Sequence, residues 1–304
     1  MLLFPNCKIN IGLRVVRKRE DGYHDLETIF YPVMGLHDEL EVEAIKNNTT
    51  PPYTTLHDSI QFLQEGLAVD CPAEDNLIIK CYQRMRTRYP QIGSIRIRFR
   101  KNIPFGAGLG GGSSDAAHMA IALNEIFALG LSKEQLAEEV RPLGADCPFF
   151  VYNTPCYAEG IGDKLSSITL DLSGLRLVMI KPACGVSTKE AYAGIKPKGT
   201  CELFKDLNVL NDFKVLTNLT NDFEETVCRI HPEIAEIKMR LQEAGAIYAA
   251  MSGSGSTVFG LFTTPHHTTL HHAAQHNAEG SADAQLRLLD EETAQMIILN
   301  DTLG

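Results

Sequence analysis

The stretch 104–115, PFGAGLGGGSSD, holds the residues best suited to chemistry in this sequence. Because glycine has no Cβ, a backbone this rich in glycine can bend sharply and bring its N–H groups close to an anion. The stretch leads into a helical segment at 113–129, for which Ser113 or Ser114 is the expected cap. A helix start offers unpaired N–H groups and the positive end of a dipole, so we predict a site for a phosphate-bearing ligand.

The lysine-bearing P-loop is one class of glycine loop that this stretch does not match. That loop needs a lysine followed by Ser or Thr after its last glycine. Here Gly112 is followed by Ser113, Ser114 and Asp115, and the next lysine is Lys133. A flexible loop without a ligand is a further alternative, but so ordered a helix start is not typical of a linker.

The dinucleotide fingerprint GxGxxG is matched formally at 106–111, and Glu125 lies where a ribose-binding acid would be sought. Its context differs from that fold, however. The preceding strand at 94–100 alternates apolar and basic residues, which indicates a half-exposed strand. Glu125 falls inside a helical segment and not at the end of a following strand. The sequence therefore disfavours a dinucleotide site.

Lys8 and Asp146 could supply acid–base and electrostatic chemistry. Lys8 lies on a strand expected at 7–13, and Asp146 lies among small and apolar neighbours. A buried carboxylate is costly unless it is paired, and a Lys–Asp pair would keep the aspartate ionised and able to accept a hydroxyl proton. Phosphoryl transfer to an alcohol needs such a group beside a phosphate site. An exposed lysine, a structural ion pair and a helix-capping aspartate are the alternatives.

Composition limits the class of protein. The 304 residues suffice for two domains, and 44% of them are hydrophobic and 22% charged. A net charge of −10 argues against a nucleic-acid surface. The basic cluster at 14–19 is short, and is either a solvated loop or a region that steers an anionic substrate.

The spacing of the cysteines and the hydropathy of the sequence indicate the cellular compartment of the protein. The eight cysteines are dispersed without a Cys-x-x-Cys pair, which is typical of reduced thiols in a cytoplasmic protein. No apolar run reaches the length of a membrane span, and the first residues lack the pattern of a secretory signal. We therefore expect a cytoplasmic protein with no membrane or nucleic-acid partner.

The elements that must position these residues form a mixed pattern. Alternating or apolar runs predict strands at 7–13, 37–44, 94–100, 175–180 and 258–262. Helical periodicity and caps predict helices at 76–89, 113–129, 132–141, 188–194 and 231–244. The strands follow one another in groups and the helices are separate from them along the chain, which indicates an α+β fold.

The pattern Pro-x-x-x-Gly-Leu-Gly-x-x-Ser-Ser at 104–114 resembles the phosphate loop of the GHMP kinases, which include galacto-, homoserine, mevalonate and phosphomevalonate kinases. Further segments that resemble this family follow in order along the chain: PNCKIN at 5–10, DGYH at 21–24, EDNL at 74–77, LGADCP at 143–148, GVST at 185–188 and SGSGS at 252–256. The similarity extends from Pro5 to about Phe262. DGYH and LGADxPFF resemble the members whose alcohol substrate is a cytidine diphosphate-linked methylerythritol.

The resemblance implies a two-domain α+β GHMP kinase fold. An N-terminal nucleotide-binding α/β domain at 1–165 would carry the ATP phosphate loop, and a ferredoxin-like α+β domain would occupy 166–304. ATP and Mg²⁺ are the implied cofactors, with the metal ligands left undefined. By the same resemblance Asp146 is the catalytic base and Lys8 its partner.

The resemblance also implies two sets of binding residues. The ATP site would comprise Asn76, Leu77, Lys101, Pro104, Phe105, Gly106, Ala107, Gly108, Leu109, Gly110, Gly111, Gly112, Ser113 and Ser114. The substrate site would comprise Asn10 at the acceptor, Tyr23 stacking on cytosine, His24 at the cytosine edge, Tyr192 on the opposing face, and Gly253 and Ser254 in a turn that closes on the acceptor. Packing aromatics, a surface histidine and a plain tight turn are the alternatives.

The histidines at 266, 267, 271, 272 and 276 include pairs with the i, i+4 spacing of helical metal ligands. They lack an HExxH pattern, so a solvated helix face is the preferred interpretation. The tail beyond Gly280 matches no pattern. Two other functions stay open on the sequence: a GHMP kinase for another alcohol, and a nucleotide-binding sensor without activity.

Overall fold

The computed structural model describes residues 1–45, 59–69, 71–205, 213–263 and 301–302. The chain forms two compact units. The first comprises Met1–Lys8, Pro32–Phe105 and Gly110–Thr154, and the second comprises Ile9–Tyr31, Gly106–Leu109 and Pro155–Gly304. Strand β2 (Asn6–Lys18) and the glycine loop thus contribute residues to both units, and the expected boundary after residue 165 stays a prediction.

A four-stranded sheet in the order β1-β4-β6-β5 forms one layer of the first unit. Its strands are β1 (Leu2–Leu3), β4 (Glu39–Ala44), β6 (Ile95–Lys101) and β5 (Ile60–Gly66). Strand β4 pairs antiparallel with β1 and β6, and β5 pairs parallel with β6. Strand β6 alternates buried apolar and exposed basic residues, which confirms the half-exposed strand expected before the glycine loop.

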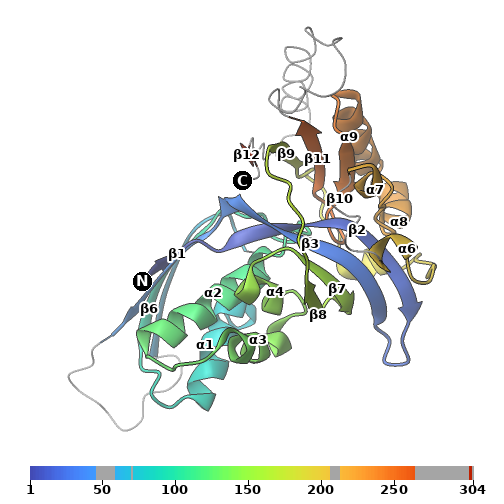
Figure 1. The fold of residues 1–304 in the computed structure, drawn as a ribbon. Coiled ribbons are helices and arrows are strands. Elements are labelled where there is room, and N and C mark those ends of the chain that lie inside the picture. Colours follow the sequence, from blue (N-terminus) through green and yellow to red (C-terminus); the bar gives the residue numbers. More distant parts are fainter. Residues whose placement is uncertain (46–58, 70, 206–212, 264–300, 303–304) are drawn as a thin grey trace. The chain divides into compact units, whose positions relative to one another are not determined.

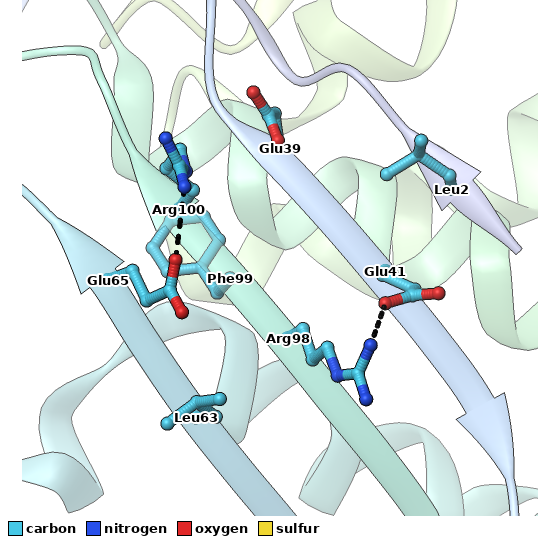
Figure 2. A pocket seen from close by; sticks show the side chains of 8 residues that line it. All are labelled: Leu2, Glu39, Glu41, Leu63, Glu65, Arg98, Phe99 and Arg100. Carbon is cyan, nitrogen blue, oxygen red and sulfur yellow. Dashed lines mark hydrogen bonds and ion pairs between the residues drawn. The ribbon is translucent and has the colours of Figure 1, made fainter.

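The three arginines of β6, Arg96, Arg98 and Arg100, lie on the exposed face of this sheet. Arg98 pairs with Glu41 on β4 at 3.4 Å, and Arg100 pairs with Glu65 on β5 at 3.2 Å, across a shallow hollow (Figure 2). Exposed pairs of this kind contribute little to stability. The hollow is therefore a solvated ion-pair face, and the apolar residues of β6 point to the opposite side, toward the core.

Four α-helices of the first unit pack together beside this sheet (Figure 1). They are α1 (Leu77–Arg88), α2 (Gly111–Ile126), α3 (Lys133–Val140) and α4 (Cys147–Tyr152), with the 3-10 turns η2 (Ala73–Asp75) and η3 (Arg141–Leu143). Asn76 caps α1 through its side chain, and Ser132 forms a capping box with Gln135 at α3. The predicted cap of α2 is wrong, because this helix begins at Gly111 behind Gly110 with φ 70° and without a side-chain cap.

The second unit contains most of a sheet in the order β2-β3-β7-β8. Its strands are β2 (Asn6–Lys18), β3 (His24–His37), β7 (Cys156–Gly160) and β8 (Lys164–Ser167). Strand β2 is longer than the strand expected at 7–13, mainly because it continues to Lys18. The expected strand at 37–44 is instead the end of β3 and the whole of β4. Asp38 separates them, and its side chain is fully buried.

A second sheet of this unit has the order β10-β11-β9-β12. Its strands are β9 (Leu175–Ile180), β10 (Tyr248–Met251), β11 (Val258–Thr263) and β12 (Asp301–Thr302). The helices of the unit are α5 (Thr188–Tyr192), α6 (Glu202–Lys205), α7 (Phe213–Leu216), α8 (Glu224–Ile230) and α9 (Pro232–Glu243). Buried apolar residues of α8, α9 and the sheet form one core. The α+β class is confirmed. The elements that were not predicted are β1, most of β3, β5, β7, β8, β10, β12, α4 and α6 to α8.

Candidate active site

Lys8 and Asp146 form an ion pair within the first unit. Lys8 lies near the start of β2 and is 3% exposed, and its Nζ lies 3.4 Å from Oδ2 of Asp146. Asp146 occupies the N-cap position of α4, but its side chain makes no capping hydrogen bond. Its side chain is 30% exposed. The structure therefore favours an accessible carboxylate held by a buried ammonium group over a helix-capping aspartate.

The start of α2 lies beside this pair, because glycines let the backbone approach it. A Cβ at Gly110 would lie 2.9 Å from the ring of Phe150 and 3.2 Å from Cε of Lys8. Gly110 has φ 70°, a conformation that favours glycine. Because α2 runs from Gly111 to Ile126, its N-terminal dipole and free N–H groups face the side of Lys8. The first unit thus brings together the features of an anion site.

Ser113, in the first turn of α2, lies against the loop that carries Asp146. Its Oγ is 3.5 Å from the position of a Cβ on Gly144, and its hydroxyl hydrogen-bonds with the thiol of Cys147. Burial is the main reason that the pKa of this thiol is raised, to about 12, so Cys147 stays protonated. The hydroxyl of Ser113 is a hard oxygen donor of the kind that fits Mg²⁺.

Lys101 lies beneath the helix start in a buried charge cluster. Its Nζ donates to Asp38 at 2.5 Å and to Asp115 at 2.8 Å, and Asp38 also accepts the N–H groups of Asn102 and Ile103. Burial and the charge of Asp38 raise the pKa of Asp115 well above its usual range, although Lys101 opposes this shift. Oδ1 of Asp115 has no hydrogen-bond partner among the described residues. Lys101 therefore stabilises the start of α2 through its buried ion pairs with Asp38 and Asp115.

The second unit joins Asn10 to two glycine-rich turns. The N–H of Asn10 donates to Oγ of Ser252 at 3.2 Å, and its side-chain amide donates to Thr28 at 3.1 Å. The hydroxyl of Ser252 in turn donates to the carbonyl of Gly108 at 2.9 Å. Gly253 has φ 56°, and a Cβ there would lie 3.3 Å from Oδ1 of Asn10. Asn10 thus lies where the 106–109 loop meets the 252–256 turn.

Asn221 holds the 252–256 turn in place. Its side-chain amide donates to the carbonyls of Met251 at 2.7 Å and Gly253 at 2.8 Å, and its Oδ1 accepts the N–H of Phe223. The side chain is 3% exposed. An amide that satisfies two buried carbonyls fixes the backbone of the turn and leaves it little freedom.

An aromatic group lies elsewhere in the second unit. The rings of His24 and Tyr192 stack with centroids 4.6 Å apart, and Tyr192 meets Phe223 edge-on at 4.7 Å. Tyr23 is 62% exposed. Burial, with a smaller contribution from the charge of Lys18, lowers the pKa of His24 below its usual value, so its ring is neutral at pH 7. A neutral imidazole offers one donor and one acceptor.

Family comparisons agree with this arrangement of loops. Residues 76–154 match the family described as GHMP kinases N terminal domain, and residues 203–276 match GHMP kinases C terminal. A 4-diphosphocytidyl-2-C-methyl-D-erythritol kinase from Parabacteroides distasonis is 45% identical over 267 residues, which cover 88% of this chain and 93% of that protein. The protein of that name from Bacteroides thetaiotaomicron is 47% identical, with 86% and 92% covered.

The chain belongs to the 4-diphosphocytidyl-2-C-methyl-D-erythritol kinase family of the GHMP kinases. A crystal structure of 4-(cytidine 5'-diphospho)-2C-methyl-D-erythritol kinase matches with a TM-score of 0.72 and 31% identity, covering 94% of this chain and 96% of that one. Homoserine kinase from Cytophaga hutchinsonii matches with a TM-score of 0.66 at 16% identity, covering 95% of this chain and 89% of that one, and shows the fold alone. The resemblance read from the glycine loop is confirmed.

The other predicted site residues of this GHMP kinase lie in different surroundings. Asn76 is the N-cap of α1, and a methyl of Leu77 lies 3.7 Å from the position of a Cβ on Gly112, so both lie close to the loop. The side chain of Phe105 is exposed. Lys101 is buried between two carboxylates and does not point to solvent. The histidines at 266–276 lie outside the described residues.

Sequence reasoning missed several residues that shape the site of this family member. They are Thr28, Asp38, Asp115, Asn221 and Ser252. Ser252 stands directly before the glycines of a recognised turn, which was a usable signal. Asp115 follows the two serines of the loop, which was another. Asn221 and Thr28 carry no local pattern, because their partners are distant in the sequence.

Proposed function

We propose that this chain transfers the γ-phosphoryl group of ATP to the 2-hydroxyl of 4-diphosphocytidyl-2-C-methyl-D-erythritol, a step of the non-mevalonate isoprenoid pathway. The Lys8–Asp146 pair beside the start of α2 is the observation that carries the proposal. Relatives named for this kinase at 45% and 47% identity support the choice of substrate. The free cysteines of the described chain fit a cytoplasmic setting.

In the proposed reaction Asp146 accepts the proton of the 2-hydroxyl, whose oxygen forms a bond to the γ-phosphorus while the bond to the β-phosphate oxygen breaks and ADP leaves. Lys8 keeps Asp146 ionised and stabilises negative charge on the transferred group. The N–H groups at the start of α2 bind the phosphates. Positioning and charge stabilisation provide most of the catalysis in phosphoryl transfer.

Mg²⁺ is part of the proposal. The hydroxyl of Ser113, in the first turn of α2, is an oxygen donor that would help to hold the ion. When bound, the ion neutralises phosphate charge.

The cytidine group would be recognised in the second unit. Tyr23 offers an exposed ring for stacking, and neutral His24 offers both a donor and an acceptor to the cytosine edge. Tyr192 stacks on His24 and fixes its plane. Tyr192 thus acts through His24 in this proposal, and does not bind the base from the opposing side. Asn10, Gly253 and Ser254 would bind the acceptor end.

The test is ATP consumption by the purified chain with this cytidine diphosphate substrate, compared with mevalonate and homoserine. Turnover with the cytidine substrate alone is expected. Faster turnover with another alcohol would assign a different GHMP kinase activity. Nucleotide binding without turnover on any of them would indicate a sensor. Tyr23→Ala should raise KM for the cytidine substrate and leave KM for ATP unchanged.

A further inference from the structure

Three side chains with metal-ligating atoms converge in the second unit, apart from the glycine turns and the aromatic pair. They are Cys184, His231 and Glu233, and one ligand atom from each lies within 4.8 Å of the others. Cys184 lies in the segment between β9 and α5. His231 lies between α8 and α9, and Glu233 is in the first turn of α9. The cluster is partly buried.

The donor types in this cluster are those that zinc takes. Thiolate, imidazole and carboxylate all bind Zn²⁺, and a site with three protein ligands completes its tetrahedron with water. Hard cations such as Mg²⁺ and Ca²⁺ prefer oxygen and avoid sulfur. We propose that Cys184, His231 and Glu233 bind one Zn²⁺ ion, with water as the fourth ligand.

The orientation of His231 supports this assignment. Its Nδ1 lies 3.7 Å from the carboxylate of Glu233, on the side of the cluster, and its Nε2 lies 3.2 Å from Oε1 of Glu190. A metal-binding histidine commonly donates its other ring N–H to a carboxylate, which fixes the ring. Glu190 is itself held by a capping box with Ser187 at the start of α5. The ring is therefore oriented with Nε2 on Glu190 and Nδ1 toward Glu233, so Nδ1 is the nitrogen that would bind the ion.

The thiol of Cys184 lies against the carboxylate of Glu233, with which it hydrogen-bonds. The nearby ammonium of Lys181 donates to the carbonyls of Pro182 and Cys184. A cysteine binds zinc as the thiolate, so binding would release the thiol proton to solvent.

The backbone of Cys184 would connect the ion site to the 252–256 turn. The hydroxyl of Ser256 donates to the carbonyl of Cys184 at 2.7 Å. An ion that joins Cys184 to the start of α9 would restrict this carbonyl and, through it, Ser256. The site would thus stabilise the segment 184–187 and the turn together.

The test is cobalt and zinc binding to the untagged, full-length, metal-free protein. Cobalt bound to thiolate gives a charge-transfer band in the near ultraviolet, whereas the histidines at 266–276 contribute imidazole alone and give none. We expect one cobalt per chain with this band, displaced by one zinc. Zinc affinity is then measured by competition with a chromophoric chelator.

Cys184→Ser, His231→Ala and Glu233→Gln should each remove the band or weaken zinc binding strongly. Glu190→Gln should keep the band and bind zinc about 10-fold to 100-fold more weakly, because it loses only the outer partner of His231. Cys71→Ser and His271→Ala are the controls and should behave like the unaltered protein. Zinc should also raise the Tm of the unaltered protein but not that of Cys184→Ser.

The proposal is overturned if the band is absent, or if Cys184→Ser binds zinc as tightly as the unaltered protein. It is equally overturned if His271→Ala abolishes binding while His231→Ala keeps it. Should one variant fail to fold, the folded variants among the other two decide the outcome by the same criteria.

Discussion

The hydroxyl of Ser252 donates a hydrogen bond to the carbonyl oxygen of Gly108, with 2.9 Å between the two oxygens. The backbones are close as well, since a Cβ at Gly108 would overlap the carbonyl of Ser252 and lie 3.1 Å from that of Gly255. The N–H of Thr257 adds a hydrogen bond to the carbonyl of Ala107. The 106–109 loop and the 252–256 turn, which are far apart in the sequence, therefore pack directly against each other through their backbones.

Gly108→Ala should damage the kinase far more than Gly106→Ala. Both glycines have positive φ, 76° and 64°, so each alanine costs about 1 kcal/mol or somewhat more in backbone strain. Only the alanine at 108 meets the backbone of the second turn, because nothing lies within 4 Å of a Cβ at Gly106. We expect at least a tenfold loss of kcat/KM for ATP in Gly108→Ala and a much smaller loss in Gly106→Ala. Equal losses would show that the packing of the turns is unimportant.

Asp146→Asn should lower kcat by about a hundredfold to ten-thousandfold, the contribution usual for a general base. Nucleotide binding should be largely kept, because the asparagine retains the shape of the side chain. Single-turnover kinetics and nucleotide titration measure the two separately. Lys8→Met removes the buried partner of Asp146 and should lower kcat too. If Asp146→Asn turned over at a rate close to that of the unaltered protein, Asp146 would not be the general base.

KM for the cytidine substrate should depend on pH through His24. The pKa of His24 lies below its usual value of 6.5, because burial and Lys18 disfavour the imidazolium form. Substrate binding that needs a neutral ring is therefore constant near pH 7 and weakens only when the pH falls below 6.5. His24→Gln keeps a donor and an acceptor without titrating in this range, so its KM should show no such rise. The same acid rise in His24→Gln would assign the effect to another group.

The buried carboxylate of Asp115 should make stability depend on pH. Its pKa is raised well above 3.8 in the folded protein, so the folded state holds a proton that the unfolded state has lost. The stability that this proton provides is present below the unfolded pKa and is lost as the pH rises through the folded pKa. Asp115→Asn cannot titrate. Its free energy of unfolding relative to the unaltered protein should increase as the pH rises above about 4. Chemical denaturation across this range measures it, and a constant difference would contradict the shift.

The sequence predicted the parts of the site that leave a local pattern. The glycine loop, the helix starts near Asn76 and Ser132 and the alternating strand β6 depend on neighbours in the chain, and each lies where it was expected. The start of α2 was misplaced because Gly110 itself takes the αL conformation at the cap, which serine would not favour.

The parts that could not be predicted depend on partners distant in the sequence. Asp38 reaches Lys101 across 63 residues, and Ser252 reaches Gly108 across 144. Nothing near Asp38 indicates a buried carboxylate, because the acidic residues that follow it, Glu39, Glu41 and Glu43, lie on the partly exposed face of β4. The motif at 104–115 predicts an anion site, but the tertiary fold determines which charged residues are buried next to it.

Strand β2 buries both of its sides, with Asn6, Lys8 and Asn10 alternating with Cys7, Ile9 and Ile11. Since side chains on a strand alternate, inserting or deleting one residue between Lys8 and Asn10 would turn one of the two polar groups to the apolar side. Surface loops tolerate insertions and deletions, because the change in length does not disturb the packed core. In β2 every position from Asn6 to Ile11 is buried, so a change in length is not tolerated. The evolutionary record of this segment should therefore consist of substitutions and contain no single-residue gaps.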